Sequence, residues 1–348
     1  MKPKKISVVV PIYNVEAFLP QCLDSLYAQK GVLLEPILVN DGATDGSPAL
    51  CRDYQRRHPG TLVIDKENGG LSDARNAGLA HATGDYVFFL DADDWMAPDA
   101  LASLLAFAEA EHCDVVQGAF YYAWTDHLLL DDRYTHGKPD TFTLSRDEAM
   151  RELVSNQYVK NFAWGKLLRT DIARRHPFRK GAWFEDSFWM HHIIEEAQRY
   201  GVVNRPLYYY RQREQGISGT FSVRNLDLLR GNEERLRFIQ SRHPDLLPDM
   251  ADFYWRLCRQ MHALADARGG EVARAFDAYC AKADAEYCPL FNEVLGCRTD
   301  YRLATRHPQI AKALGFARRV YNHFFGKRLK RIDLHSSGCQ QNTHEKTD

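Results

Sequence analysis

The chain has 348 residues, of which 45% are hydrophobic and 12% aromatic, and this composition suits a globular protein with one large domain and a smaller appendage. It contains no run of about eighteen apolar residues, so no transmembrane helix is expected. The formal net charge is −1, but residues 298–332 hold ten Lys or Arg against one acid, so a basic contact surface is predicted near the C-terminus.

The eight cysteines and the N-terminus both indicate a cytoplasmic protein. The cysteines form no C-x-x-C pair and have no histidines at zinc-finger spacing, so we expect reduced, individually packed thiols. The apolar run behind the basic N-terminus is interrupted at Pro11 and Asn14 and lacks a small-residue cleavage site. This run is therefore interpreted as a first strand and not as a signal peptide.

The first 111 residues alternate between apolar runs and amphipathic segments. Strands are predicted over 6–10, 36–39, 62–64 and 86–90. Helices are predicted over 16–29, from the polar turn at 40–47 to about residue 57, over 74–81 and over 98–111. This order predicts an α/β fold with a doubly wound, mostly parallel sheet and right-handed crossovers. The loops that follow the four strands should converge on one site, because the carboxyl ends of parallel strands share one edge.

Three acids follow the fourth predicted strand. The uninterrupted apolar run over 86–90 is typical of a strand buried on both faces, and it leads directly into Asp91, Asp93 and Asp94. Carboxylates a few Å apart raise each other's pKa unless a cation or a hydrogen-bonded ligand neutralises them. We therefore expect a divalent metal at this edge of the sheet.

The next hundred residues are less regular. A fifth strand is predicted over 115–124, and residues 126–143 could form an exposed hairpin or a loop over the site. Ser145 with Glu148 three residues later indicates a capping box that opens a helix. A short strand over 162–168, a helix from about 183 that begins with two acids, and an apolar segment over 202–210 follow.

From about residue 225 the strands give way to long helical periods. Helices are predicted over 225–242, 246–267, 270–286 and 308–331, separated by Pro and Gly. We expect an α/β domain over 1–220, a helical C-terminal domain over 221–333, and a polar, disordered tail over 334–348.

Four motifs occur in order, each at the carboxyl end of a predicted strand. They are Val-Val-Val-Pro-Ile-Tyr-Asn, Val-Asn-Asp-Gly-Ala-Thr-Asp-Gly-Ser, Asn-Gly-Gly-Leu-Ser-Asp-Ala-Arg-Asn-Ala-Gly and Phe-Leu-Asp-Ala-Asp-Asp. Together they resemble the family 2 glycosyltransferases of the GT-A fold, inverting enzymes that use nucleotide-activated sugars and serve many bacterial surface-polysaccharide pathways. The resemblance is close over residues 5–120, weaker to about 220, and does not cover the helical remainder. It implies that residues 1–220 form a GT-A catalytic domain.

The resemblance implies a UDP-sugar site at these loops. Asp41 would recognise uracil, and Asp91 and Asp93, as the family's D-x-D motif, would hold Mg²⁺ or Mn²⁺ against the diphosphate. The alternatives are a turn cap for Asp41 and a structural ion pair for Arg75. Asp94 would cap a helix or support its neighbours. The donor-binding residues implied in this way are Pro11, Tyr13, Asn14, Asp41, Asn68, Arg75, Asp91, Ala92 and Asp93, with Arg211 and Arg213 as diphosphate contacts.

The acceptor side of the reaction needs a base. Glu185 and Asp186 resemble the family's Glu-Asp pair, in which the Asp deprotonates the attacking hydroxyl group. A helix N-cap is the alternative role for Asp186. Trp164, Lys166 and Glu185 are expected to contact the acceptor or to support the base. The expected acceptor is a glycan or a lipid-linked glycan.

Other functions stay open at this point. A sugar nucleotidyltransferase needs a Gly-rich basic loop after the first strand, and a dinucleotide-binding domain needs G-x-G-x-x-G, whereas Pro-Ile-Tyr-Asn stands there. A non-catalytic nucleotide-sugar binder would bind the donor without turnover. The predicted helix over 308–332 would either pack on the catalytic domain or bind the inner face of the cytoplasmic membrane. Nucleic acid is not an expected partner, because no recognised binding motif accompanies the basic residues.

Overall fold

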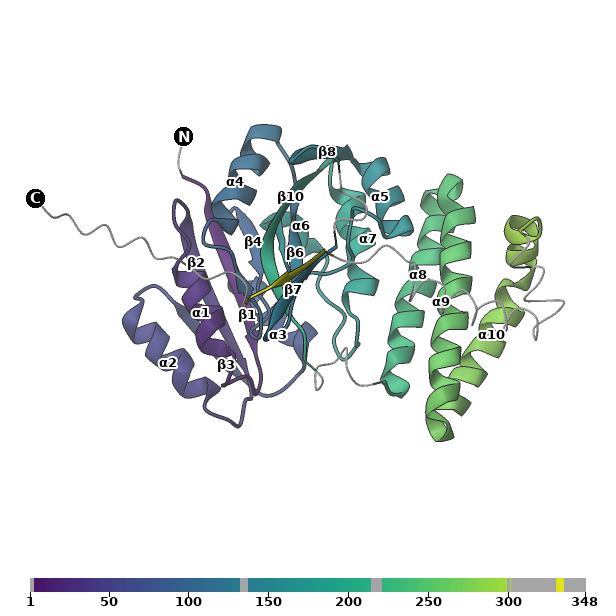
Figure 1. The fold of residues 1–348 in the computed structure, drawn as a ribbon, viewed down its shortest axis with the longest axis horizontal. Helices are drawn as coiled ribbons and strands as arrows, with labels where there is room; N and C mark the ends of the chain where they lie inside the picture. Colours follow the sequence, from purple (N-terminus) through teal and green to yellow (C-terminus); the bar gives the residue numbers. More distant parts are fainter. Residues whose placement is uncertain (1–2, 132–136, 214–220, 299–300, 302–329, 335–348) are drawn as a thin grey trace, which may run out of the picture.

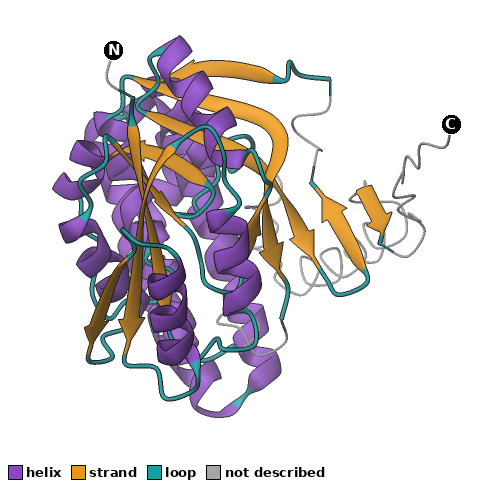
Figure 2. Ribbon diagram, turned by 90° about the vertical axis from the view of Figure 1, so that its left-hand side faces the viewer, coloured by secondary structure: helices purple, strands orange, loops and turns teal. Residues whose placement is uncertain are grey.

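The computed structural model describes residues 3–131, 137–213, 221–298, 301 and 330–334. An eleven-stranded sheet forms its centre, with helices on both faces and three long helices beyond one of them (Figures 1 and 2). Eight of its strands follow the order β11 (Lys330–Asp333), β7 (His127–Leu130), β6 (Val115–Ala123), β9 (Lys166–Arg169), β4 (Tyr86–Phe89), β1 (Lys5–Ile12), β2 (Leu33–Asp41) and β3 (Leu62–Lys66). Strand β10 (Arg199–Arg211) joins β5 (Trp95–Met96), β6 and β8 (Thr141–Ser145). The predicted α/β class is confirmed.

The N-terminal half of the sheet is parallel, as predicted. Strand β1 (Lys5–Ile12) pairs with β2 (Leu33–Asp41) on one side and β4 (Tyr86–Phe89) on the other, and β2 pairs with β3 (Leu62–Lys66). The helices between them are α1 (Leu19–Tyr27), α2 (Ser47–Arg57) and α3 (Leu71–His81), and α4 (Ala100–Glu111) follows. The chain moves outward from β1 to β3 and returns to β4, so four loops meet at one carboxyl edge.

The other half of the sheet is mixed. Strand β9 (Lys166–Arg169) lies antiparallel between β4 and β6 (Val115–Ala123), and β10 (Arg199–Arg211) runs parallel to β6. The open prediction for residues 126–143 resolves partly as a hairpin, since β7 (His127–Leu130) pairs antiparallel with β6. Short strands β5 (Trp95–Met96) and β8 (Thr141–Ser145) pair with β10. Helices α5 (Arg146–Ser155), α6 (Thr170–Arg175) and α7 (Asp186–Glu196) complete this half.

Two apolar cores lie on opposite faces of the sheet because side chains alternate along each strand. Val8 and Val10 of β1 pack in the core that includes α1 and α4, whereas Val9 packs in the core that includes α3, α5 and α7. In Figure 1, α1 and α2 lie to the left of the sheet and α7 to its right. The capping box at Ser145 is confirmed: its Oγ accepts from the N–H of Glu148, which in turn accepts from the N–H of Ser145.

The helical region extends the core that includes α3, α5 and α7. Helices α8 (Leu226–Arg242), α9 (Leu247–Arg268) and α10 (Gly270–Leu295) follow two short 3₁₀ turns, Val223–Asn225 before α8 and Pro244–Leu246 before α9. Leu229 and Leu236 of α8 belong to the same core as Ile193 of α7, so this region packs directly on the α/β part. Helix α10 continues through Pro289 and ends nine residues later than the predicted 286. No helix among the described residues has the length and apolarity needed to cross a bilayer.

The end of the predicted C-terminal helix is wrong. Residues Lys330–Asp333 form strand β11, which pairs antiparallel with β7, and therefore Lys330, Arg331 and Ile332 do not continue a helix. The strand is favoured there because β7 offers an unpaired edge whose backbone groups need partners. Most of the predicted helix and surface segment, residues 302–329, and the predicted tail from residue 335 lie outside the described residues.

Candidate functional site

The acidic loop after β4 is joined to the end of β10 by hydrogen bonds. Asp94 is buried, and its carboxylate accepts from the Tyr208 hydroxyl at 2.8 Å and from the backbone N–H of Arg211 at 2.7 Å. Burial raises the pKa of Asp94 well above its ordinary value, and the charges of Asp93 and Asp91 add to the rise. Asp94 therefore supports the loop, as expected.

Two arginines surround Asp93. The carboxylate of Asp93 forms an ion pair with Arg213 at 2.6 Å, and its carbonyl oxygen accepts from Nε of Arg211, also at 2.6 Å. The guanidinium of Arg211 also stacks 4.6 Å from the ring centroid of Trp95. Burial raises the pKa of Asp93, and the charge of Asp91 adds to the rise, whereas Arg213 lowers it. The predicted diphosphate contacts thus lie beside the predicted metal ligand.

Arg75 connects the acidic loop to the predicted base region. Only 2% of its side chain is exposed, its Nη2 lies 2.7 Å from Oδ1 of Asp91, and its Nη1 donates to Oε1 of Glu185. The ring centroid of Phe178 lies 5.4 Å from the guanidinium. Burial lowers the pKa of Arg75, but Asp91 and Glu185 outweigh it and the net shift is upward. The alternative role of Arg75, a structural ion pair, is therefore observed, and the pairing brings Asp91 and Glu185 to the same guanidinium.

Asp41 lies at the end of β2 and orders the glycine turn before α3. Its carboxylate accepts from the backbone N–H groups of Gly69 at 3.0 Å and Gly70 at 2.8 Å, and from Lys66 Nζ at 2.5 Å. Asn68 donates from Nδ2 to the carbonyl oxygen of Asp41 at 3.0 Å. Gly70 has a φ of 83°, which a residue with a side chain rarely adopts. Asp41 and Asn68 therefore act together on one loop.

The loop after β1 lies at the same edge, next to the loop after β2. Pro11 is buried within β1, while Tyr13 is half exposed and Asn14 has a left-handed backbone with a φ of 49°. Oδ1 of Asn14 accepts from the N–H of Thr44 at 2.8 Å, which joins the first two loops. A hollow of about 500 Å³ is lined by residues 14–18 together with Asp45. Ala92 of the acidic loop is buried and offers only its backbone.

Asp186 begins α7 and belongs to a buried charge network. The preceding residue, Glu185, pairs with Arg75. Phe184, one residue earlier, has a left-handed backbone with a φ of 54°, which residues other than glycine rarely adopt. Oδ1 of Asp186 accepts from Nδ2 of Asn161 at 3.2 Å. Burial raises the pKa of Asp186 to about 7, and the neighbouring Glu185 charge acts in the same direction, whereas Arg75, Lys166 and Arg235 oppose it. A carboxyl group with such a pKa is suited to take up a proton near neutral pH.

Lys166 and Trp164 lie behind this network. Lys166 is buried and donates from Nζ to the carbonyl oxygen of Phe162, and burial lowers its pKa to about 7 although Asp186 acts to raise it. Trp164 is buried in an aromatic stack, with ring centroids 4.6 Å from Tyr208 and 5.0 Å from Tyr210. Both side chains support the site from within and present little surface to an acceptor.

Three contributors to the site carry no local sequence signal. Asn161 lies in a loop, Tyr208 in a strand rich in aromatic residues, and Arg235 in the middle of α8. Each resembles an ordinary residue of its element in the sequence. Their roles depend on contacts with residues between 25 and 117 positions away, which only the fold specifies.

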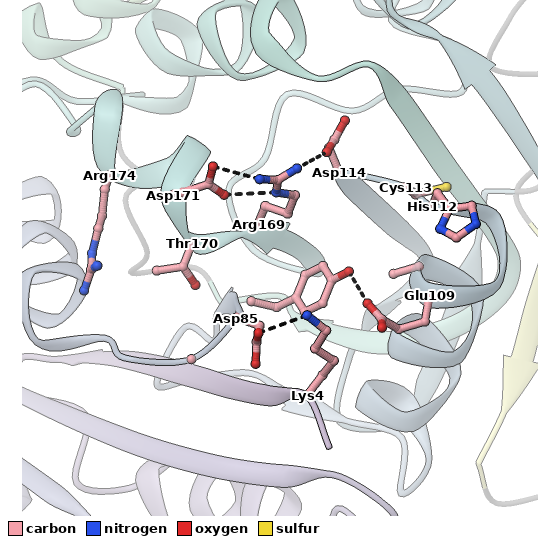
Figure 3. Close-up of a pocket in the computed structure, with 13 residues that line it drawn as sticks. Lys4, Asp85, Glu109, His112, Cys113, Asp114, Arg169, Thr170, Asp171 and Arg174 are labelled. Atoms are coloured by element: carbon pink, nitrogen blue, oxygen red, sulfur yellow. Dashed lines mark hydrogen bonds and ion pairs between the residues drawn. The ribbon is translucent and has the colours of Figure 1, made fainter. Parts of the chain in front are cut away.

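A second hollow, of about 480 Å³, lies at the amino-terminal edge of the strands (Figure 3). Its charged side chains pair with one another: Lys4 with Asp85 at 3.1 Å, and Arg169 with Asp114 at 3.1 Å. It is separated from the acidic loop by the length of the sheet, so it is not part of the candidate site.

The acidic loop fits a hard divalent cation. Asp91 and Asp93 each expose 20% of their side chains, and each pairs with a guanidinium, so both carboxylates lie where positive charge is bound. Mg²⁺ and Mn²⁺ are bound by oxygen ligands, and one or two protein carboxylates suffice when phosphate oxygens and water fill the other positions. Asp93 is the less constrained of the two, because its partner Arg213 is 29% exposed, whereas Asp91 is paired with Arg75, which is 2% exposed.

A doubly wound sheet with a D-x-D loop at its carboxyl edge, near a partly buried acid at the start of a helix, is the arrangement of a glycosyltransferase of the GT-A type. Residues 7–179 match the family model for glycosyl transferase family 2, and this segment belongs to that family. The family match ends before Glu185, Asp186 and Arg235.

Similar proteins agree with this assignment. Glycosyltransferase GlyA of Streptococcus pneumoniae serotype 4 is 33% identical over 224 residues, which cover 62% of this chain and 31% of GlyA. The chain thus spans less than a third of that relative. TarS 1-349 of S. aureus has the same fold with a TM-score of 0.60 and 20% identity, covering 74% of this chain and 73% of TarS. The TarS structure in complex with UDP-GlcNAc gives a TM-score of 0.54 at 19% identity, covering 75% and 83%.

Mannosyltransferase PcManGT of Pyrobaculum calidifontis, in complex with GDP-Man and Mn²⁺, has a TM-score of 0.50 and 19% identity, covering 94% of this chain and 89% of PcManGT. At these identities the structural likeness shows the shared fold alone.

Proposed function

We propose that this protein moves a sugar from a UDP-sugar to a hydroxyl group of a glycan or lipid-linked glycan, with inversion at the anomeric carbon. The observation that carries the proposal is the Arg75 bridge, in which one buried guanidinium contacts Asp91 and Glu185 together. A donor whose diphosphate lies at the acidic loop would have its anomeric carbon close to Asp186, the residue after Glu185. Donor and base would thus share one edge of the sheet.

The donor would lie across the loops after β1, β2 and β3. An ionised carboxylate has about four acceptor positions, and Asp41 uses three of them for Lys66, Gly69 and Gly70, which leaves one for a pyrimidine N–H. UDP-GlcNAc in the TarS complex makes a UDP-sugar the first donor to test. Asn68, Tyr13, Asn14 and Pro11 would frame the nucleotide.

Asp93, assisted by Asp91, would hold Mg²⁺ or Mn²⁺, and the Mn²⁺ in the PcManGT complex supports this choice. The cation would neutralise the negative charge that develops on the leaving diphosphate. Arg213 would exchange its ion pair with Asp93 for the diphosphate oxygens, since guanidinium groups bind phosphate through paired N–H donors. Arg211 would stay in place, because it already bonds to the backbone of the loop.

Asp186 would act as the base. The proton of the acceptor hydroxyl would pass to its carboxylate as the hydroxyl oxygen bonds to the anomeric carbon and the bond to the diphosphate breaks. Since the pKa of Asp186 is about 7, its unprotonated fraction grows as pH rises through 7, and transfer should accelerate over that range. Glu185 stays paired with Arg75 and would orient the helix start.

The setting of the reaction is also part of the proposal. We place it in the cytoplasm, where nucleotide sugars are used and the seven described thiols would stay reduced. A lipid-linked acceptor would bring the protein to the inner face of the membrane, with the basic residues of 308–329 as the contact.

The deciding experiment measures release of UDP from a panel of UDP-sugars with Mg²⁺ or Mn²⁺, with and without candidate glycan acceptors. Acceptor-stimulated release with at least one donor is the expected result. Donor binding by calorimetry without any release would indicate a non-catalytic binder, and formation of UDP-sugar from UTP and a sugar phosphate would indicate a nucleotidyltransferase.

A further inference from the structure

Arg235 of α8 is a buried cation that reaches the start of α7. Only a small part of the residue, 3%, is exposed, and it comes from the helical region beyond the family match. Its Nη2 donates to Oδ1 of Asn161 and to the carbonyl oxygen of Ser187, the latter at 3.1 Å. Its Nε has no hydrogen-bond partner. An arginine buried in this way needs a compensating negative charge, and Asp186 is the acid that acts on its pKa.

Asn161 transmits the effect of Arg235 to Asp186. A guanidinium only donates hydrogen bonds, so the carbonyl oxygen of the Asn161 side chain must face Arg235. The amide nitrogen must then face the other way, where it donates to Oδ1 of Asp186 at 3.2 Å and to Oγ of Ser187 at 3.1 Å. Arg235 thereby fixes the orientation of the Asn161 amide group, and this orientation gives Asp186 a donor that favours its charged form.

Charged groups of several elements act on Asp186. Glu185 on its own helix opposes ionisation, as burial does, whereas Arg75 of α3, Lys166 of β9 and Arg235 of α8 favour it. Arg75 is shared with Asp91 and Glu185, and Lys166 donates to a backbone carbonyl. Among the groups that favour ionisation, Arg235 is the one connected to Asp186 through a single bridging side chain.

We propose that Arg235, acting through Asn161, is a positioning residue that favours the ionised form of Asp186 and aims it toward the acceptor, so that the helical region is part of the catalytic apparatus. The proposal rests on the role of Asp186 in the proposed function. It extends the site to a segment outside the family match. Without Arg235, the Asn161 amide could turn over and present its oxygen to Asp186, which would favour the protonated acid.

The direct test is a ¹³C NMR titration of the Asp186 carboxyl group in aspartate-labelled full-length protein. The Asp186 signal is assigned by its loss in Asp186→Asn. In Arg235→Met we expect the pKa of Asp186 to rise by about one unit, the lower end of what an adjacent opposite charge provides. Asn161→Leu should cause a rise of similar size, and Arg235→Lys a smaller one. Arg242→Met removes the same charge from an exposed position at the end of α8 and serves as the matched control.

Turnover provides a second readout. The acid limb of the kcat profile should move to higher pH in Arg235→Met, and Arg235→Met should change kcat little when Asp186 is already Asn, because both changes then affect one group. An unchanged Asp186 titration in both Arg235→Met and Asn161→Leu, in variants with native circular dichroism, overturns the proposal. If Arg235→Met does not fold, the titration of Asn161→Leu decides. A wild-type protein without turnover on any donor contradicts the proposed function, whereas the titration still decides the role of Arg235.

Discussion

Arg75→Leu should destabilise the protein by breaking a buried ion triad. The arginine side chain is 2% exposed, and its partners Asp91 and Glu185 expose 20% and 9%. Removing one partner of a buried pair typically costs about 3–5 kcal/mol, because the remaining charge stays buried without compensation. Asp91 can gain water on its exposed side, so we expect about 3 kcal/mol, concentrated on Glu185.

Urea denaturation followed by circular dichroism measures this loss as a lower midpoint at an unchanged slope. Arg52→Leu is the matched control, because it breaks an ion pair with Asp65 whose side chains are 45% and 48% exposed. It should cost at most about 1 kcal/mol. Glu185→Gln added to Arg75→Leu should restore part of the stability. Equal losses in Arg75→Leu and Arg52→Leu, or no recovery with Glu185→Gln, would refute the argument that the triad is held by charge compensation.

Four further outcomes are expected. Asp93→Asn should abolish metal-dependent donor binding without unfolding, and near-normal turnover of this variant in EDTA would contradict the metal role. Asp186→Asn should retain donor binding and lose transfer by roughly 10²-fold, the scale of a lost general base, and unchanged turnover would move the base elsewhere. His191 is buried, and burial holds its pKa well below the ordinary value. As the pH falls, the histidine of the unfolded chain is therefore protonated before that of the folded protein, and the free energy of unfolding should fall as pH drops below about 6.5. His191→Leu should flatten that part of the stability curve, and identical curves would exclude His191 as the cause. Full-length protein should float with anionic liposomes at low salt and float less when the Lys and Arg residues of 308–329 are replaced by Gln, whereas equal flotation would exclude this segment as the membrane contact.

The parallel half of the fold could be predicted because its signals are local. β-branched runs, amphipathic periods and glycine turns each specify one element, and the four motifs follow strands that the structure contains. Strand β9 shows where this reasoning ends: its sequence indicates a short strand, but nothing in it states that the strand inserts antiparallel between β4 and β6. Pairing partners are chosen by the whole sheet.

The candidate site was predictable in its acids and not in their partners. Asp91, Asp93 and Asp186 stand in recognisable motifs, whereas the contact between Arg75 and Glu185 joins residues 110 positions apart. The same holds for Asn161 and Arg235, which are 74 positions apart. These residue types occur at many surface and core positions. A hydrogen-bond acceptor for Arg75 or Arg235 becomes necessary only because the fold buries the guanidinium. Long-range charge compensation of this kind has no periodicity for a sequence pattern to reveal.

Strand β11 has a consequence for the solubility of the protein. It covers β7, whose residues 128–130 are all leucine, and it brings Arg331 to the outermost strand of the sheet. Charged residues on an edge strand disfavour pairing with another chain, whereas an uncovered apolar edge is a template for it. If the chain is shortened so that it ends before residue 330, β7 becomes an exposed edge strand. The expected result is edge-to-edge strand pairing between molecules that are otherwise correctly folded.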